Sequence, residues 1–189
     1  MFQSLRQPEY IHVLLNPLPI YGLAMGVLGL GVSLVLRSGT AQRVSLLLVL
    51  AAAGSAWPVS VYGERGYDRV YAMADSDGQA WLKAHRQRAE RLVYVFAGLA
   101  LLALAGIVGS LKWPRLAFAL AAATLLLSLA ALGAGGWIAY AGGKIRHREF
   151  RNEPPPKEQG ESFLESSPTK AASRVVCGKS RPSAKGQAP

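Results

Sequence analysis

The chain has 189 residues, of which 51% are hydrophobic and 17% charged, and its formal net charge is +10. Long stretches carry no charge, so the charged residues crowd into a few short segments, unlike those of a water-soluble domain. A basic balance is typical of nucleic-acid-binding proteins, but cations also gather at the cytoplasmic ends of membrane helices, which disfavours nucleic acid as a partner here. The single cysteine, Cys177, excludes an internal disulfide and any thiolate cluster.

Four stretches contain no Asp, Glu, Lys, Arg or His and are about as long as the 20 residues that a helix needs to cross a hydrocarbon core of about 30 Å. They cover residues 17–36, 44–62, 92–111 and 116–141. Their length and composition predict an all-α protein, an integral membrane four-helix bundle over residues 1–151 in contact with a lipid bilayer. Pro17 and Pro19 open the first stretch and no small-residue cleavage pattern follows closely, so we expect a retained helix and not a cleaved leader.

Two segments outside the apolar stretches have distinct compositions. The connection 63–91 begins with a charged, turn-rich part at 64–69 and continues as a helix, capped by Asp75 or Asp77, which runs into the third span. Gly142 and Gly143 are expected to end the fourth helix. Residues 152–189 are basic and rich in Pro, Ser and Gly, which predicts a disordered tail because so little apolar surface cannot form a core.

The distribution of Lys and Arg predicts the orientation of the four spans. Of the 21 cationic residues, the two short turns hold Arg37, Arg43, Lys112 and Arg115, while the other 17 lie on the side of the termini and the long connection. The positive-inside rule therefore places both termini in the cytoplasm, in the inner membrane of a bacterium.

Small residues at helical spacing mark expected packing faces. Gly22 and Gly26 form a GxxxG in the first span, and Gly98 and Gly109 belong to a small-residue face of the third. Such residues let helix backbones approach closely, either within the bundle or, as an alternative, in a homodimer or against other membrane subunits. In the fourth span Thr124 and Ser128 are expected to bond back to the carbonyl one turn earlier.

Three histidines, His12, His85 and His147, are candidate cofactor ligands. By the predicted topology all lie on the cytoplasmic side near helix ends. Two imidazoles on neighbouring helices could ligate a b-type haem, whereas interfacial histidines could equally make hydrogen bonds or face lipid headgroups. Carboxylates nearby leave a metal site open as a further alternative, although no metal-binding motif is present. The absence of GxSxG and of a phosphate loop favours a non-enzymatic protein over an enzyme.

Three features of the sequence resemble a bacterial four-helix membrane domain of unknown function. They are the run from His12 through Asn16-Pro17-Leu18-Pro19-Ile20, His85 before the third span, and the Gly-Gly ending with His147. The resemblance covers roughly residues 10–150 and favours His85 and His147 over His12, because this chain has Asn16-Pro17 where the family often has a second histidine. Relatives fused to Rieske-type domains or encoded beside cytochromes imply redox partners.

These observations leave two main functional hypotheses. The first is a redox-linked membrane protein of a respiratory or photosynthetic assembly, with a b-type haem as its candidate cofactor; the second is a cofactor-free structural or assembly subunit. A permease or enzyme ranks last, because transporters usually carry ionisable groups or broken helices at mid-membrane and these spans are uncharged.

Overall fold

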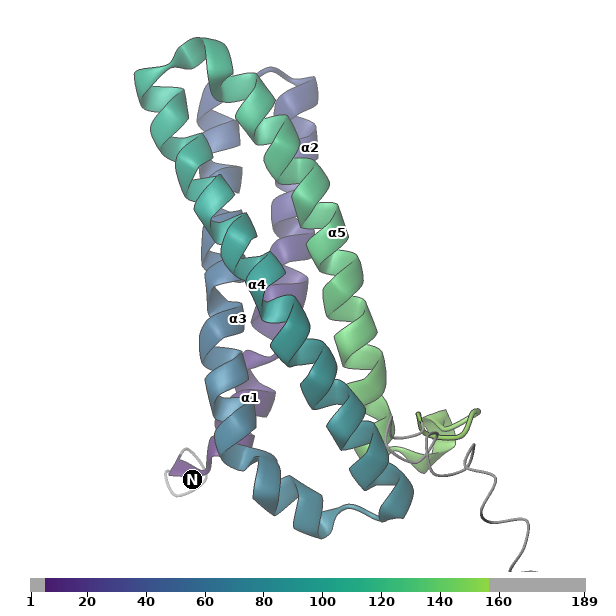
Figure 1. Cartoon of the computed structure of the whole chain (residues 1–189). Helices are drawn as coiled ribbons and strands as arrows, with labels where there is room; N and C mark the ends of the chain where they lie inside the picture. The colour runs from purple at the N-terminus through teal and green to yellow at the C-terminus, as the bar shows by residue number, and fades with distance from the viewer. Residues whose placement is uncertain (1–5, 157–189) are drawn as a thin grey trace, which may run out of the picture. The chain divides into compact units, whose positions relative to one another are not determined.

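A computed structural model describes residues 6–156 of the chain, and the unit considered below ends at Pro155. Four helical stretches within it are long and apolar enough to cross a bilayer: Pro8–Val35, Gly39–Met73, Ser76–Lys112 and Pro114–Arg146. They run up and down beside one another, without any strand in the described part (Figure 1). This confirms the predicted all-α membrane bundle. From residue 157 onward the predicted disordered tail lies outside the described residues.

The first stretch consists of three consecutive elements. Helix α1 covers Pro8–Leu15, a π-helical turn η2 covers Leu18–Gly22, and α2 covers Leu23–Val35. Pro17 and Pro19 explain the interruption, because two prolines remove two backbone N–H donors from the α-helical ladder. The first helical stretch begins at Pro8, before the predicted boundary at residue 17. The π-helical turn separates its polar start, α1, from its membrane part, α2.

Helix α3 covers Gly39–Met73, and the Ser38 side chain caps its start by accepting a hydrogen bond from the amide of Ala41. The helix continues through Pro58 and includes the charged residues 64–69. The prediction of a turn there is wrong. One proline removes a single backbone bond, and the neighbouring turns keep the helix continuous.

Helix α4 covers Ser76–Lys112 and α5 covers Pro114–Arg146, followed by a short 3-10 turn η3 at Arg148–Phe150. The predicted cap is confirmed at Asp75, whose carboxylate accepts from the Gly78 amide at 3.1 Å. The predicted helix end at Gly142 and Gly143 is wrong, because α5 continues to Arg146.

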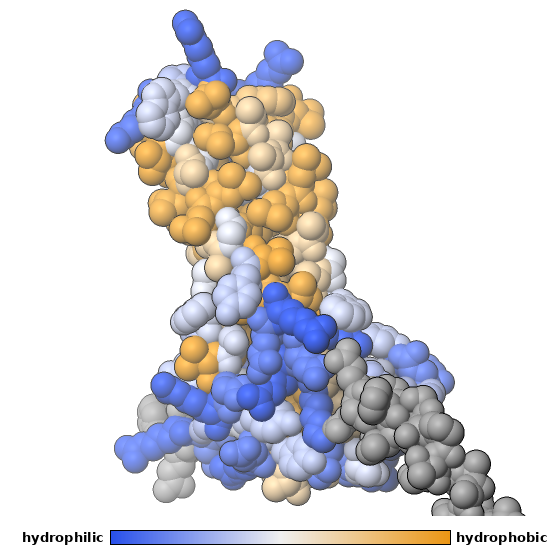
Figure 2. Space-filling model, in the orientation of Figure 1, coloured by the Kyte–Doolittle hydropathy of each residue, from blue (hydrophilic) through white to orange (hydrophobic). Residues whose placement is uncertain are grey.

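The long helices extend beyond the thickness of a bilayer. The 35 residues of α3 span roughly 50 Å at about 1.5 Å per residue, against about 30 Å of hydrocarbon. In Figure 2 one part of the bundle surface is mostly apolar and the other is mostly polar. The polar part holds α1, the α3–α4 turn and the C-terminal end of α5 (Figure 1), and we call it the charged end.

Small residues allow η2 and α2 to pack closely on α3. A Cβ at Gly22 would lie 3.0 Å from the Cβ of Ala52, and one at Gly26 would lie 2.7 Å from a methyl of Val49. On α4, a Cβ at Gly109 would meet Leu120 at 2.5 Å. Gly98 differs, since a Cβ there would meet nothing within 4 Å of the described chain.

The two hydroxyls predicted to bond back along α5 behave differently. Thr124 donates to the carbonyl of Leu120 at 2.8 Å, as expected. Ser128 is fully buried, yet its Oγ has no hydrogen-bond partner among the described residues, so that part of the prediction is wrong.

Candidate cofactor site

His12 projects from α1 onto α3. Its ring Nδ1 lies 2.8 Å from the backbone carbonyl oxygen of Val59. The ring rests where Gly63, one helical turn further along α3, has no side chain: a Cβ there would lie 2.9 Å from the ring. The histidine is thus held by a backbone acceptor and a glycine on the same face of one helix.

His85 makes the same set of contacts on the other pair of helices. It projects from α4 onto α5, and its Nδ1 lies 2.9 Å from the carbonyl oxygen of Ile138. Gly142 lies one turn beyond Ile138, and a Cβ at that position would lie 3.1 Å from the ring Nδ1.

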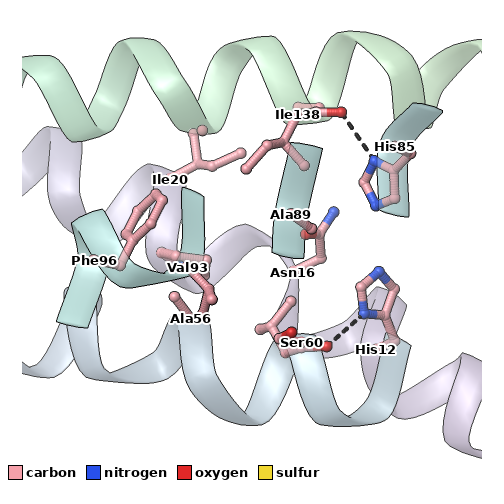
Figure 3. A pocket seen from close by; sticks show the side chains of 14 residues that line it. His12, Asn16, Ile20, Ala56, Ser60, His85, Ala89, Val93, Phe96 and Ile138 are labelled. Atoms are coloured by element: carbon pink, nitrogen blue, oxygen red, sulfur yellow. Dashed lines mark hydrogen bonds between the residues drawn. The ribbon is translucent and has the colours of Figure 1, made fainter. Parts of the chain in front are cut away.

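The two imidazoles lie next to each other. Their ring centroids are 6.3 Å apart and their planes are nearly perpendicular, at 87°. Because a carbonyl oxygen only accepts, each Nδ1 carries the proton, and in the neutral imidazole this leaves a lone pair on Nε2. In Figure 3 these Nε2 atoms point toward the gap between the rings. The site therefore presents two unprotonated nitrogens to whatever lies between them.

A small cavity of about 70 Å³ extends from the gap into the membrane part of the bundle. Its deeper walls are apolar, with Ile20, Val93 and Phe96 among the lining side chains, while Asn16 lies beside the histidines (Figure 3). A bound group would thus have polar contacts at the histidines and an apolar surface further in.

On the other side of the histidines, a groove of about 640 Å³ opens at the charged end. All four long helical stretches contribute to its walls. Its carboxylates are ion-paired with arginines: Glu9 with Arg69 at 2.9 Å, and Glu64 and Glu90 both with Arg86. The groove is of a size typical of sites for small molecules and cofactors.

His147 lies on the wall of this groove but apart from the other two histidines. It is exposed, its Nδ1 lies 2.9 Å from an oxygen of Glu149, and its ring lies against Phe150 with centroids 5.1 Å apart. The resemblance favoured His85 and His147 over His12 as ligands, whereas the structure brings His12 to His85.

Residues 6–156 contain no group of three or more His, Cys, Asp or Glu side chains that could hold a metal ion. Zinc sites take at least three protein ligands, so the carboxylates considered in the sequence do not build one here. Two facing imidazoles alone suit a metal whose remaining ligands come from a cofactor.

Sequence reasoning missed the partners of the histidines, which are Val59, Gly63 and Ile138. Two of these act through backbone carbonyls, which no side-chain pattern reveals. The glycine signal was present, because Gly63 and Gly142 each lie at the polar end of an apolar stretch. They were interpreted as the start of the connection and as a helix end, whereas both lie within continuous helices.

An ion-pair cluster fixes the chain after α5 to the α3–α4 turn. Arg151 bonds both carboxylate oxygens of Asp75, at 2.8 and 2.9 Å, and also donates to the carbonyls of Lys144 and Ile145. The hydrogen bond from Arg151 lowers the pKa of Asp75 to about 2, and the bond from the Gly78 amide acts in the same direction.

The amine of Lys144 occupies an aromatic box beside this cluster. It is 4.4 Å from the ring centre of Trp81 and 4.0 Å from that of Tyr140, and it donates to Glu153 at 2.7 Å. Glu153 falls in the segment predicted to be disordered, so the packed unit extends slightly beyond the predicted boundary at residue 151.

Comparison with protein-family models, with curated proteins and with solved structures finds no match to this chain. The site's own geometry and the resemblance noted in the sequence are therefore the two grounds for a functional proposal.

Proposed function

We propose that the protein is a redox-linked, multi-pass protein of the bacterial inner membrane that holds a b-type haem near the cytoplasmic face through His12 and His85. The observation that carries this proposal is the pair of facing imidazoles with their Nδ1 atoms bonded to carbonyls, 6.3 Å between ring centroids. We propose further that it serves a respiratory or photosynthetic assembly, in line with the redox partners of the four-helix domain that it resembles.

The residues fit a haem iron in three respects. Two imidazoles that bind one metal from opposite sides, with metal–nitrogen bonds of about 2 Å, have centroids roughly 6 Å apart. Each Nε2 is the free nitrogen of its ring. The walls are apolar on the membrane side and polar toward the groove, as an amphipathic macrocycle with carboxylate substituents requires.

Haem in such a site would supply one-electron transfer between partner proteins or membrane carriers. Residues of the chain would determine how the haem is held and how far water is excluded from it. The carbonyls of Val59 and Ile138 fix the histidine tautomers and increase the basicity of Nε2, which favours the binding of a metal by that nitrogen. Ile20, Val93 and Phe96 exclude water from one side of the gap.

The proposed orientation follows from the charges. Among the described residues, the charged end carries Arg6, the six cations of the long connection, and four cations at and after the end of α5. The opposite end carries Arg37, Arg43, Lys112 and Arg115. The positive-inside rule places the charged end, with both termini, in the cytoplasm. The histidine pair would then lie at the level of the cytoplasmic headgroups.

The test is a visible absorption spectrum of the full chain purified in detergent from cells supplied with iron and a haem precursor. We expect a Soret band in the wild type and its loss in both His12→Ala and His85→Ala. His147→Ala is the matched control and should keep the band, because His147 is bonded to Glu149 outside the gap. A near-perpendicular pair of imidazole planes further predicts a strongly anisotropic low-spin EPR signal.

A colourless wild-type protein that copurifies with a large membrane complex would instead support the cofactor-free structural or assembly subunit. A Soret band that survives in His12→Ala but disappears in His147→Ala would overturn the ligand assignment while leaving haem in place.

A further inference from the structure

The His12 and His85 contacts are two copies of one arrangement. In each copy a histidine on one helix bonds a backbone carbonyl on the neighbouring helix, and a glycine follows that carbonyl by four residues. The copies are His12 with Val59 and Gly63, and His85 with Ile138 and Gly142. Residues four apart lie on the same face of a helix, so carbonyl and glycine together form the seat of the ring.

Both glycines are needed for that seat. A Cβ at Gly63 would lie 2.9 Å from both Cε1 and Nδ1 of His12, closer than real Cβ contacts. A Cβ at Gly142 would lie 3.1 and 3.2 Å from Nδ1 and Cε1 of His85. An added methyl group would therefore push each ring away from the carbonyl that holds its Nδ1, strongly in the first case and less in the second.

We propose that Gly63 and Gly142 are positioning residues that seat the two imidazoles equivalently, so that His12 and His85 would hold one bound group as a pseudo-symmetric pair. The proposal rests on the proposed function for the identity of the bound group. The way in which the glycines seat the two rings depends on the chain alone and can be tested without the bound group.

Two other glycines serve as matched controls. Gly54 lies on α3 with Gly63, and Gly136 lies on α5 with Gly142, and a Cβ at either control position would meet nothing within 4 Å of the described chain. Alanine at these positions changes helix propensity as it does at Gly63 and Gly142, but it touches neither ring.

The first experiment is nitrogen NMR of the haem-free full chain in detergent, with ¹⁵N-labelled histidine. In the wild type, His12 and His85 should both show a protonated Nδ1 and an unprotonated Nε2. Gly63→Ala should shift the His12 signals toward tautomer exchange and leave those of His85 in place. Gly142→Ala should do the reverse with a smaller shift, and Gly54→Ala and Gly136→Ala should change neither ring.

The second experiment measures haem affinity of the same four variants by Soret titration. Loss of a group that orients a metal ligand typically weakens binding about 10- to 100-fold, so we expect losses of that order for Gly63→Ala and smaller ones for Gly142→Ala. A wild type without any Soret band overturns the proposed function, while the NMR result still decides the seating. Histidine signals that are identical in Gly63→Ala and Gly54→Ala overturn the seating. If Gly63→Ala does not fold, Gly142→Ala, whose contact is looser, tests the seating through the His85 signals.

Discussion

Arg151 forms a bidentate ion pair with Asp75, a residue 76 positions earlier in the chain, with nitrogen–oxygen distances of 2.8 and 2.9 Å. Asp75 also caps α4, and Arg151 also binds two carbonyls at the end of α5. One arginine therefore joins the α3–α4 turn to the last turn of α5. This contact joins two distant segments at the charged end, next to Met73 and Ile145, which line the groove beside the histidines.

The arginine contact predicts a loss of stability in Arg151→Ala. The variant leaves two carbonyls without their donor and Asp75 with Arg148 as its remaining cation. We expect a cost of about 1–3 kcal/mol, which lowers the melting temperature by several degrees in a chain of this size. Melting in detergent, followed by circular dichroism, measures it. Arg151→Lys should recover little, since an ammonium does not reproduce the planar fork. An unchanged melting temperature in Arg151→Ala would show that this contact holds nothing together.

The lowered pKa of Asp75 predicts a pH dependence of stability. Its folded pKa of about 2 lies below the ordinary value of 3.8, so the folded chain binds this proton less readily than the unfolded chain. The resulting stabilisation is complete above about pH 3.8 and is lost as the pH falls toward 2. Asp75→Asn keeps a good helix cap but does not titrate. We expect the melting temperatures of wild type and Asp75→Asn to converge over this interval; parallel curves would contradict the assignment.

The helices and their order could be predicted from the sequence because a bilayer imposes a simple rule on length and charge. The cap at Asp75 followed from local chemistry in the same way. The pairing of His12 with His85 could not, because it depends on how α1 lies against α3 and α4 against α5. The helical conformation of residues 64–69 was missed for a related reason: this part of α3 lies against α1, where Arg69 pairs with Glu9, and local propensity does not reveal a contact between distant segments.

The unpaired hydroxyl of Ser128 predicts a stabilising substitution. It is fully buried in α5 with no partner among residues 6–156, and an unsatisfied buried hydroxyl costs about 1–3 kcal/mol. We expect Ser128→Ala to raise the melting temperature by a few degrees. Thr124→Ala is the contrasting variant, since Thr124 has its bond to Leu120 and fills its site, and it should lower the melting temperature. A destabilised Ser128→Ala would mean that the hydroxyl has a partner, such as bound water.

The close approach of α2 to α3 at Gly26 predicts a severe effect of a large side chain there. A Cβ alone would come within 2.7 Å of Val49, so Gly26→Leu must separate the two helices. Overpacking of this kind costs typically about 1–3 kcal/mol, and we expect a drop of several degrees in the melting temperature. Gly31→Leu is the matched control on the same helix, because a Cβ at Gly31 meets nothing within 4 Å in the described part of the chain, and we therefore expect its side chain to face lipid. If both variants melt like the wild type, α2 does not pack on α3 through this face; if Gly31→Leu alone is destabilised, that face contacts another chain in the membrane.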